Sequence, residues 1–149
     1  MASQNTRRRT PRKKTIFIVE DNEVYAASLK AFLHTRFTDI KEIMIFSNGE
    51  TCLSELRRKP GFLIIDYYLN SHIEEAQNGL EIIKQIRAQA SQTNIIVLSS
   101  QKNLDVILDA IREYDCNYVQ KDEDAFNTIE RTIQETYLRK NQQVHEWQS

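Results

Sequence analysis

Residues 15–21 read TIFIVED, five apolar or β-branched residues that end abruptly in the acids Glu20 and Asp21. A continuous apolar run without polar alternation is typical of a strand buried on both faces of a parallel sheet. Two further runs have the same form: FLII (62–65) ends at Asp66, and IIVL (95–98) ends at Ser99. The sequence therefore predicts three buried strands, each followed at once by a polar residue.

Around these runs, apolar residues recur at helical spacing, which predicts helices that alternate with the strands. The expected helices cover about 22–37 with Asn22 as the N-cap, from 48 to a stop at Pro60 and Gly61, about 80–90, about 104–111, and 126–137 with a polar end near Trp147. Two shorter strands are expected at 42–46 and 117–120, and residues 67–78 are expected to form a loop. Strands that alternate with helices predict parallel βαβ units and a doubly wound α/β sheet.

The composition excludes several classes of protein. The 149 residues include 40% hydrophobic residues, which suits one compact domain, and no apolar run is long enough to cross a membrane. The first 14 residues lack the apolar core of a secretory signal, and Cys52 and Cys116 do not have metal-ligand spacing. These features predict a cytoplasmic protein without membrane insertion.

Charge divides the chain into a basic arm and an acidic body. Residues 1–14 carry six of the 20 basic residues and no acids, so 14 basic residues face all 21 acids in the remainder. We expect a disordered arm at 1–14, a folded domain at 15–140 and a polar tail at 141–149. A basic arm could bind nucleic acid or an anionic membrane surface. Six charges without interleaved aromatic residues are a weak signal for nucleic-acid binding, so we expect a solvated extension and no nucleic-acid partner.

Polar residues lie at the predicted carboxyl ends of four strands: Glu20 and Asp21, Asp66, Ser99, and Lys121. In an open parallel sheet these ends form one edge, where ligands bind. Three carboxylates brought together repel one another unless a hard cation such as Mg²⁺ lies among them. Lys121 can pair with a carboxylate or with an attached anion, and the Ser99 hydroxyl can donate to that anion, so the edge suits a phosphoryl group.

The same motifs, in the same order, resemble the receiver domain of two-component response regulators from about Lys14 to Tyr137. They are VEDN (19–22), LIIDYYL (63–69), IVLSS (96–100) and NYVQK (117–121). The resemblance implies a flavodoxin-like receiver fold, with a five-stranded parallel sheet of order 2-1-3-4-5 and five helices.

The resemblance also implies the chemistry of the site. Asp66 would be the phosphoacceptor, which takes a phosphoryl group from a phosphohistidine on a histidine kinase or phosphotransfer protein. Mg²⁺ would be held by Asp21 and Asp66, with Glu20 acting through water and the backbone carbonyl of Tyr68 as a further ligand. The protein would catalyse only its own phosphorylation and dephosphorylation, so it is not expected to be an enzyme in the usual sense.

Three further roles follow from the resemblance. Lys121 and Ser99 would contact the phosphoryl group, and Tyr118 would rotate inward as a switch. The surface formed by the helix at 104–111, the strand at 117–120 and the final helix would then bind a downstream protein effector or a second copy of the chain. No further core or effector motif follows the final helix, which is expected of a stand-alone receiver or of one excised from a longer protein.

The chain departs from the family pattern near the site. Asp122 replaces the proline that usually follows the lysine, commonly after a cis peptide bond, so we expect a trans bond here. Asn70 replaces a second proline that is usual in the family. The segment at 70–78 is longer than usual, and it could form a lid, a surface for a partner or a loop without a function of its own. These departures support an alternative, a receiver-like protein-binding module that works without regulated phosphorylation.

Overall fold

The computed structural model describes residues 14–68, 79–100 and 105–148; the basic arm, except Lys14, and the insertion at 70–78 lie outside these ranges. The strands are β1 (Lys14–Val19), β2 (Ile40–Phe46), β3 (Phe62–Asp66), β4 (Asn94–Ser99) and β5 (Asn117–Gln120). The α-helices are α2 (Glu23–Arg36), α3 (Gly49–Ser54), α4 (Gly79–Gln89), α5 (Asp105–Tyr114) and α6 (Ala125–Gln148), and a 3₁₀ turn, η1, spans Leu56–Arg58. Within these ranges no helix is long and apolar enough to cross a membrane.

The five strands form one parallel sheet in the order β2-β1-β3-β4-β5, which confirms the predicted topology. The two strands that end in acids, β1 and β3, are neighbours, with Val19 opposite Ile65. On the other side of β3, Asp66 lies opposite Leu98 in β4. This register brings the residues that follow each strand to the same edge of the sheet.

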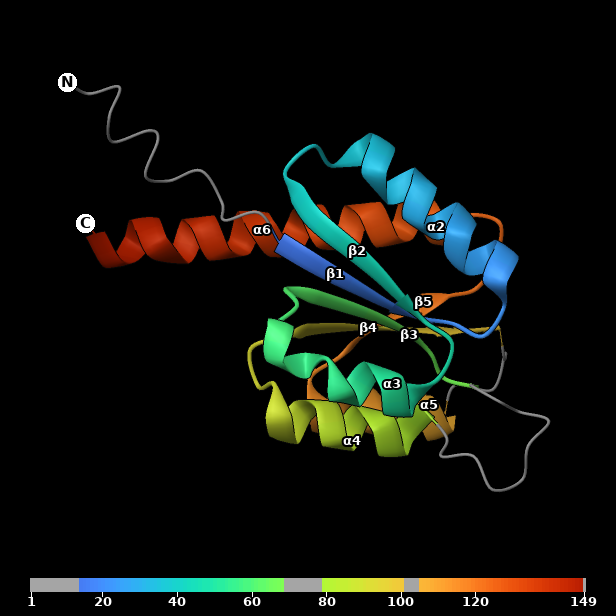
Figure 1. Cartoon of the computed structure of the whole chain (residues 1–149). Coiled ribbons are helices and arrows are strands. Elements are labelled where there is room, and N and C mark those ends of the chain that lie inside the picture. The colour runs from blue at the N-terminus through green and yellow to red at the C-terminus, as the bar shows by residue number, and fades with distance from the viewer. Residues whose placement is uncertain (1–13, 69–78, 101–104, 149) are drawn as a thin grey trace.

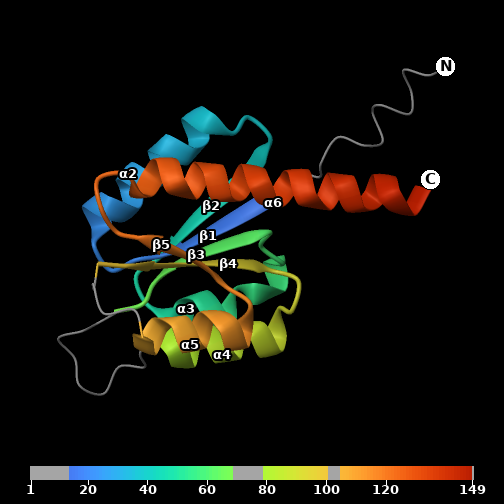
Figure 2. The ribbon, with the colours of Figure 1, turned by 180° about the vertical axis from the view of Figure 1, so that it is seen from behind.

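Helices cover both faces of the sheet: α2 and α6 lie on one face, and α3, α4 and α5 lie on the other (Figures 1 and 2). Successive side chains of a strand enter different cores, so Phe17 and Val19 pack under α3 and α4 while Ile16 and Ile18 pack under α2 and α6. Every residue of TIFIV therefore needs an apolar or small side chain, which explains the continuous apolar run.

Some element boundaries differ from the prediction. Strand β2 begins at Ile40 rather than at 42, and it lies at the edge of the sheet, where only Ile43 and Phe46 of the strand are buried. Helix α3 begins after Asn48, as predicted, but it ends at Ser54 and continues as η1 rather than as an α-helix up to Pro60. Helix α6 continues to Gln148, so the backbone of most of the predicted polar tail is helical.

Candidate functional site: the acidic edge of the sheet

The site lies at the carboxyl edge of the sheet, where β1 and β3 end side by side. Glu20 directly follows β1, and its backbone N–H donates to the Phe46 carbonyl at 2.9 Å. Asp66 is the last residue of β3, and the next N–H, that of Tyr67, donates to the Leu98 carbonyl at 2.9 Å. Backbone hydrogen bonds therefore extend to Glu20 and one residue past Asp66, which ties the backbone of both acids to the neighbouring strands.

Three carboxylates converge at this edge. Each of Glu20, Asp21 and Asp66 offers an oxygen that lies within 4.8 Å of the oxygens from the other two. Glu20 is only 2% exposed and Asp66 8%, while Asp21 is half-buried and opens the cluster toward solvent. The structure thus brings together the three acids that the sequence analysis selected as metal ligands.

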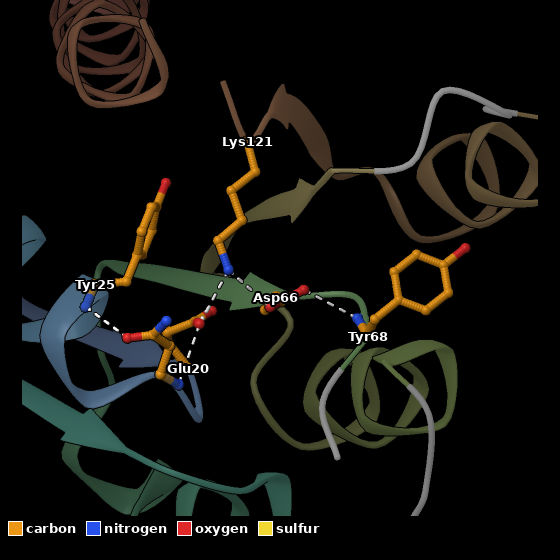
Figure 3. A network of polar contacts seen from close by, with 6 residues as sticks. Glu20, Tyr25, Asp66, Tyr68 and Lys121 are labelled. Atoms are coloured by element: carbon orange, nitrogen blue, oxygen red, sulfur yellow. Dashed lines mark hydrogen bonds and ion pairs between the residues drawn. The ribbon is translucent and has the colours of Figure 1, made fainter. Parts of the chain in front are cut away.

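Lys121, directly after β5, joins the two buried acids of this cluster. Its Nζ donates to Glu20 Oε1 at 3.0 Å and to Asp66 Oδ2 at 3.1 Å (Figure 3). The peptide bond from Lys121 to Asp122 is trans, as expected, because no described peptide bond is cis. The lysine therefore reaches Asp66 although the residue that follows it is not a proline.

The charges at the edge do not balance. Three carboxylates lie together, and the one ammonium group that the described residues place among them hydrogen-bonds two, Glu20 and Asp66, which leaves an excess of two negative charges when all three acids are ionised. Burial, together with the neighbouring Asp66 carboxyl, raises the pKa of Glu20 from 4.5 to about 7. Burial works against the charge of Lys121, but its hydrogen bonds and ion pairs with the two acids outweigh burial and raise the pKa of the lysine.

The acids fit a hard divalent cation. Glu20 Oε2 is buried and has no hydrogen-bond partner among the described residues, whereas Oε1 accepts from Lys121 and from the Asn22 N–H at 3.2 Å. An orphaned carboxylate oxygen beside two further carboxylates is the oxygen-rich donor set that Mg²⁺ takes, with water completing its shell. A bound cation would offset the negative charge that the lysine leaves uncompensated.

The backbone after Asp66 also contacts the site. The Tyr68 N–H donates to Asp66 Oδ1 at 3.0 Å, so each oxygen of this carboxylate accepts one hydrogen bond, from Tyr68 or from Lys121. The ring of Tyr68 points away from the carboxylate (Figure 3). The predicted ligand role of the Tyr68 carbonyl stays a prediction.

Ser99 and Tyr118 are connected through the end of β4. Ser99 is fully buried and Ser100 is exposed, which favours Ser99 as the residue that belongs to the site. The Ser99 carbonyl accepts from the Lys121 N–H at 2.9 Å and from the Tyr118 hydroxyl at 3.4 Å. The predicted switch residue thus contacts the backbone of the predicted phosphate-contacting residue.

Two features of the site were missed by the sequence analysis. The ring centroid of Tyr25 lies 4.4 Å from Lys121 Nζ, a contact that no motif in the sequence indicates. The Gly79 N–H donates to the Tyr67 carbonyl at 2.9 Å, and a Cβ on Gly79 would lie 2.5 Å from that oxygen. This contact joins the two ends of the 69–78 segment beside Asp66, and a glycine directly after a long polar stretch was the available signal.

Comparison with known sequences identifies the family. The family profile for the response regulator receiver domain matches residues 16–133, most of the chain. A comparison with the curated proteins finds no match.

Solved structures with the same fold are similar along most of this chain. The signal receiver domain of a modulated diguanylate cyclase from Desulfovibrio desulfuricans G20 is 22% identical, with a TM-score of 0.69, over 87% of this chain and 98% of that one. The isolated receiver domain of RcsB from Salmonella enterica serovar Typhimurium, in the presence of phosphomimetic BeF3⁻, is 19% identical, with a TM-score of 0.68, over 83% and 89%. A phosphorylated cyanobacterial phytochrome response regulator, RcpA, is 23% identical, with a TM-score of 0.66, over 84% and 94%. At these identities the likeness concerns the fold.

Proposed function

The chain belongs to the response regulator receiver domain family of two-component signalling, and from this premise we propose that Asp66 accepts a phosphoryl group from a phosphohistidine. Phosphoryl-accepting signalling is the general function of the family, and receiver domains bind Mg²⁺ through an acidic pocket. The proposal assigns these two properties to particular residues of this chain. The donor would be a histidine kinase or a phosphotransfer protein.

One observation carries the proposal: the acidic cluster and Lys121 meet at the carboxyl edge of the sheet. Asp66 is held by Tyr68 N–H on one oxygen and by Lys121 on the other, which orients the carboxylate. Each carboxylate oxygen has a second lone pair, so the group can still attack phosphorus while these hydrogen bonds persist. A buried and oriented carboxylate beside a cation is what in-line phosphoryl transfer requires.

In the proposed step, an Asp66 oxygen forms a bond to phosphorus as the P–N bond of the phosphohistidine breaks. The electron pair of the broken bond stays on the imidazole nitrogen of the donor, and the product is an acyl phosphate. Lys121 would stabilise the negative charge that develops on the phosphoryl oxygens, and the Ser99 hydroxyl would donate a hydrogen bond to one of these oxygens. Mg²⁺ would be held by Asp21 and Asp66, by Glu20 through water and by the Tyr68 carbonyl, and when bound it supplies charge neutralisation.

The output would pass through Tyr118. Movement of Ser99 toward a phosphoryl oxygen would disturb the carbonyl that the Tyr118 hydroxyl contacts, and Tyr118 lies on β5 between α5 and α6. The surface formed by α5, β5 and α6 would then change its preference between partners. We propose a downstream protein effector, or a second copy of the chain, as the partner of this surface.

The test is phosphorylation by a small-molecule phosphodonor with and without Mg²⁺, measured by intact mass. We expect a gain of one phosphoryl group that requires Mg²⁺ and is lost in Asp66→Asn. Asp109→Asn is the matched control, because Asp109 is exposed on α5 away from the acidic cluster, and it should be phosphorylated normally.

No gain by the wild-type protein under any condition would refute the proposal. It would favour the alternative, a protein-binding module that works without regulated phosphorylation. A gain that persists in Asp66→Asn would show that another residue accepts the group.

A further inference from the structure

Lys121 has a third neighbour besides the two acids, the aromatic ring of Tyr25. Lys121 Nζ lies 4.4 Å from the ring centroid, well within the range of a cation–π contact. In Figure 3 the lysine lies between this ring and Asp66. The ammonium group is therefore contacted by carboxylates on one side and by an aromatic ring on another.

The ring is itself held in place by its own surroundings. Tyr25 is in the first turn of α2, and its N–H donates at 3.0 Å to the side chain of the N-cap residue Asn22. On α6, the ring of Phe126 meets the Tyr25 ring edge-on, with centroids 5.3 Å apart. The helix start and the neighbouring helix together place the ring over the site.

The backbone around Lys121 constrains its ammonium group only weakly. The Lys121 N–H is bound to the Ser99 carbonyl at 2.9 Å, which holds the Cα, but four rotatable bonds separate Nζ from it. The bond that follows is trans and leads into a turn, in which the Asp122 N–H donates to the Gln120 carbonyl at 2.9 Å. Side-chain contacts must therefore aim the ammonium group.

The hydroxyl of Tyr25 does not explain the position of the ring. It is buried and has no hydrogen-bond partner among the described residues. The contacts of the ring therefore place this tyrosine, and they include Phe126, Lys121 and the apolar core between α2 and α6.

We propose that Tyr25 is a positioning residue for Lys121: its ring holds the ammonium group where it meets both Asp66 and an incoming phosphoryl group. The proposal rests on the function assigned to Asp66 above. It accounts for a lysine that reaches the site although no proline follows it. The hydroxyl takes no part in this role, so phenylalanine should replace tyrosine here.

Three variants separate the ring from its hydroxyl and from general packing. Tyr25→Phe keeps the ring, and Tyr25→Leu removes it while an apolar side chain remains. Phe32→Leu is the matched control, because Phe32 is also on α2 and also contacts the Phe126 ring, with centroids 5.5 Å apart. Tyr25→Met serves as a second ring-free variant, and thermal melts establish which variants are folded.

The first measurement is the NMR signal of the Lys121 side chain, identified by its loss in Lys121→Arg. Protons above an aromatic ring are shielded, so we expect the Lys121 Cε protons to be shifted upfield in wild type, Tyr25→Phe and Phe32→Leu. The shift should vanish in Tyr25→Leu and Tyr25→Met. An unshifted signal in the wild type would overturn the proposal, and this readout does not depend on phosphorylation.

The second measurement is the rate of phosphorylation at saturating phosphodonor and Mg²⁺. A contact of this kind predicts a rate about 2- to 30-fold lower in Tyr25→Leu and Tyr25→Met, with an unchanged rate in Tyr25→Phe and Phe32→Leu. Equal rates in all variants, or an equal loss in Tyr25→Phe or Phe32→Leu, would overturn the proposal. A wild type without any uptake would refute the proposed function instead, and the NMR signal would still decide whether the ring holds the lysine.

Discussion

At each edge of the sheet a cationic side chain makes several polar contacts, but Lys121 and Arg87 have opposite electrostatic surroundings. At the carboxyl edge, Lys121 faces an excess of carboxylates, and a buried oxygen of Glu20 has no hydrogen-bond partner within the described part of the chain. At the amino edge, Arg87 of α4 donates to four backbone carbonyls, those of Ser91, Thr93, Tyr114 and Asp115, at 2.9–3.2 Å. The arginine thereby joins the segment before β4 to the turn before β5.

At the amino edge, several backbone carbonyls accept hydrogen bonds from side chains of the chain itself. The Thr93 hydroxyl donates to the Pro60 carbonyl, and the Asn94 side chain donates to the Gly61 carbonyl, both at 2.9 Å. These bonds connect the start of β4 with the start of β3. The amino edge therefore contributes to stability, while the carboxyl edge keeps an imbalance of charge that a cation and a phosphoryl group can use.

The largest expected effect comes from removing the cation of the carboxyl edge. Lys121→Gln should slow phosphorylation about 100- to 1,000-fold, because one stabilising donor to the transferring group is lost. The rate with a small-molecule phosphodonor and Mg²⁺ measures this loss. Lys41→Gln, on an exposed position of β2, should leave the rate unchanged, and an equal loss there would contradict the assignment.

Removing the cation of the amino edge should affect folding instead. Arg87→Met should lower the free energy of unfolding by about 2–3 kcal/mol, because several carbonyls lose a charged donor and some are only partly reached by water. Urea denaturation measures the loss, and Arg112→Met, at an exposed position of α5, is the control. A folded Arg87→Met that is phosphorylated much more slowly than the wild type would break the division of roles between the edges.

Two glycines extend the comparison to the backbone. Gly79→Ala, at the carboxyl edge, should cost about 1–3 kcal/mol, because its Cβ would meet the Tyr67 carbonyl, which cannot move freely. Gly61→Ala, at the amino edge, should change stability by less than about 0.5 kcal/mol, since its Cβ would meet only the flexible Lys14 side chain. Denaturation of the two variants side by side tests the difference, and equal losses would contradict it.

The pKa of Glu20 predicts a pH dependence that is specific to the carboxyl edge. In the free protein the pKa of Glu20 is about 7, against an ordinary value of 4.5. Ionisation of Glu20 therefore lowers the free energy of unfolding progressively as the pH rises from 4.5 to 7. A cation must displace the proton, so Mg²⁺ should bind about tenfold more tightly at pH 8 than at pH 6. Calorimetric titration at both pH values measures this ratio, and Glu20→Gln should reduce it toward one.

A further small effect is a gain in stability near the amino edge. Lys59 follows η1 in the left-handed conformation, with φ of 52°, which costs a residue with a Cβ more than it costs glycine. Lys59→Gly should raise the free energy of unfolding by up to about 1 kcal/mol and leave phosphorylation unchanged. A slower phosphorylation would show that the edges are coupled.

The central strands could be predicted because a strand that is buried on both faces of the sheet needs apolar side chains at successive positions. β1 and β3 differ from the predicted runs by one residue at most, whereas β2, at the edge of the sheet, was predicted two residues too short. The helix after Asn48 was predicted too long, because the change to a 3₁₀ turn leaves the apolar spacing intact.

The acids of the site could be predicted for a related reason. Parallel strands end at one edge, so the residue after each apolar run is placed there by topology alone. Arg87 could not be predicted as a hydrogen-bonding centre, because its partners are carbonyls, which every residue has. Tyr25 could not be predicted as a neighbour of Lys121, because helical spacing indicates which face of α2 a residue shares but not which side chain lies opposite.

Local sequence patterns are therefore enough to predict the sheet, the order of the motifs and the proximity of Glu20, Asp21 and Asp66. These follow from local patterns, since hydrophobic periodicity and strand direction are properties of short segments. Only the tertiary structure decided that Tyr25 lies over Lys121 and that Arg87 joins two loops. Such contacts depend on the distance and direction between side chains of different elements, which are set when the helices pack on the sheet.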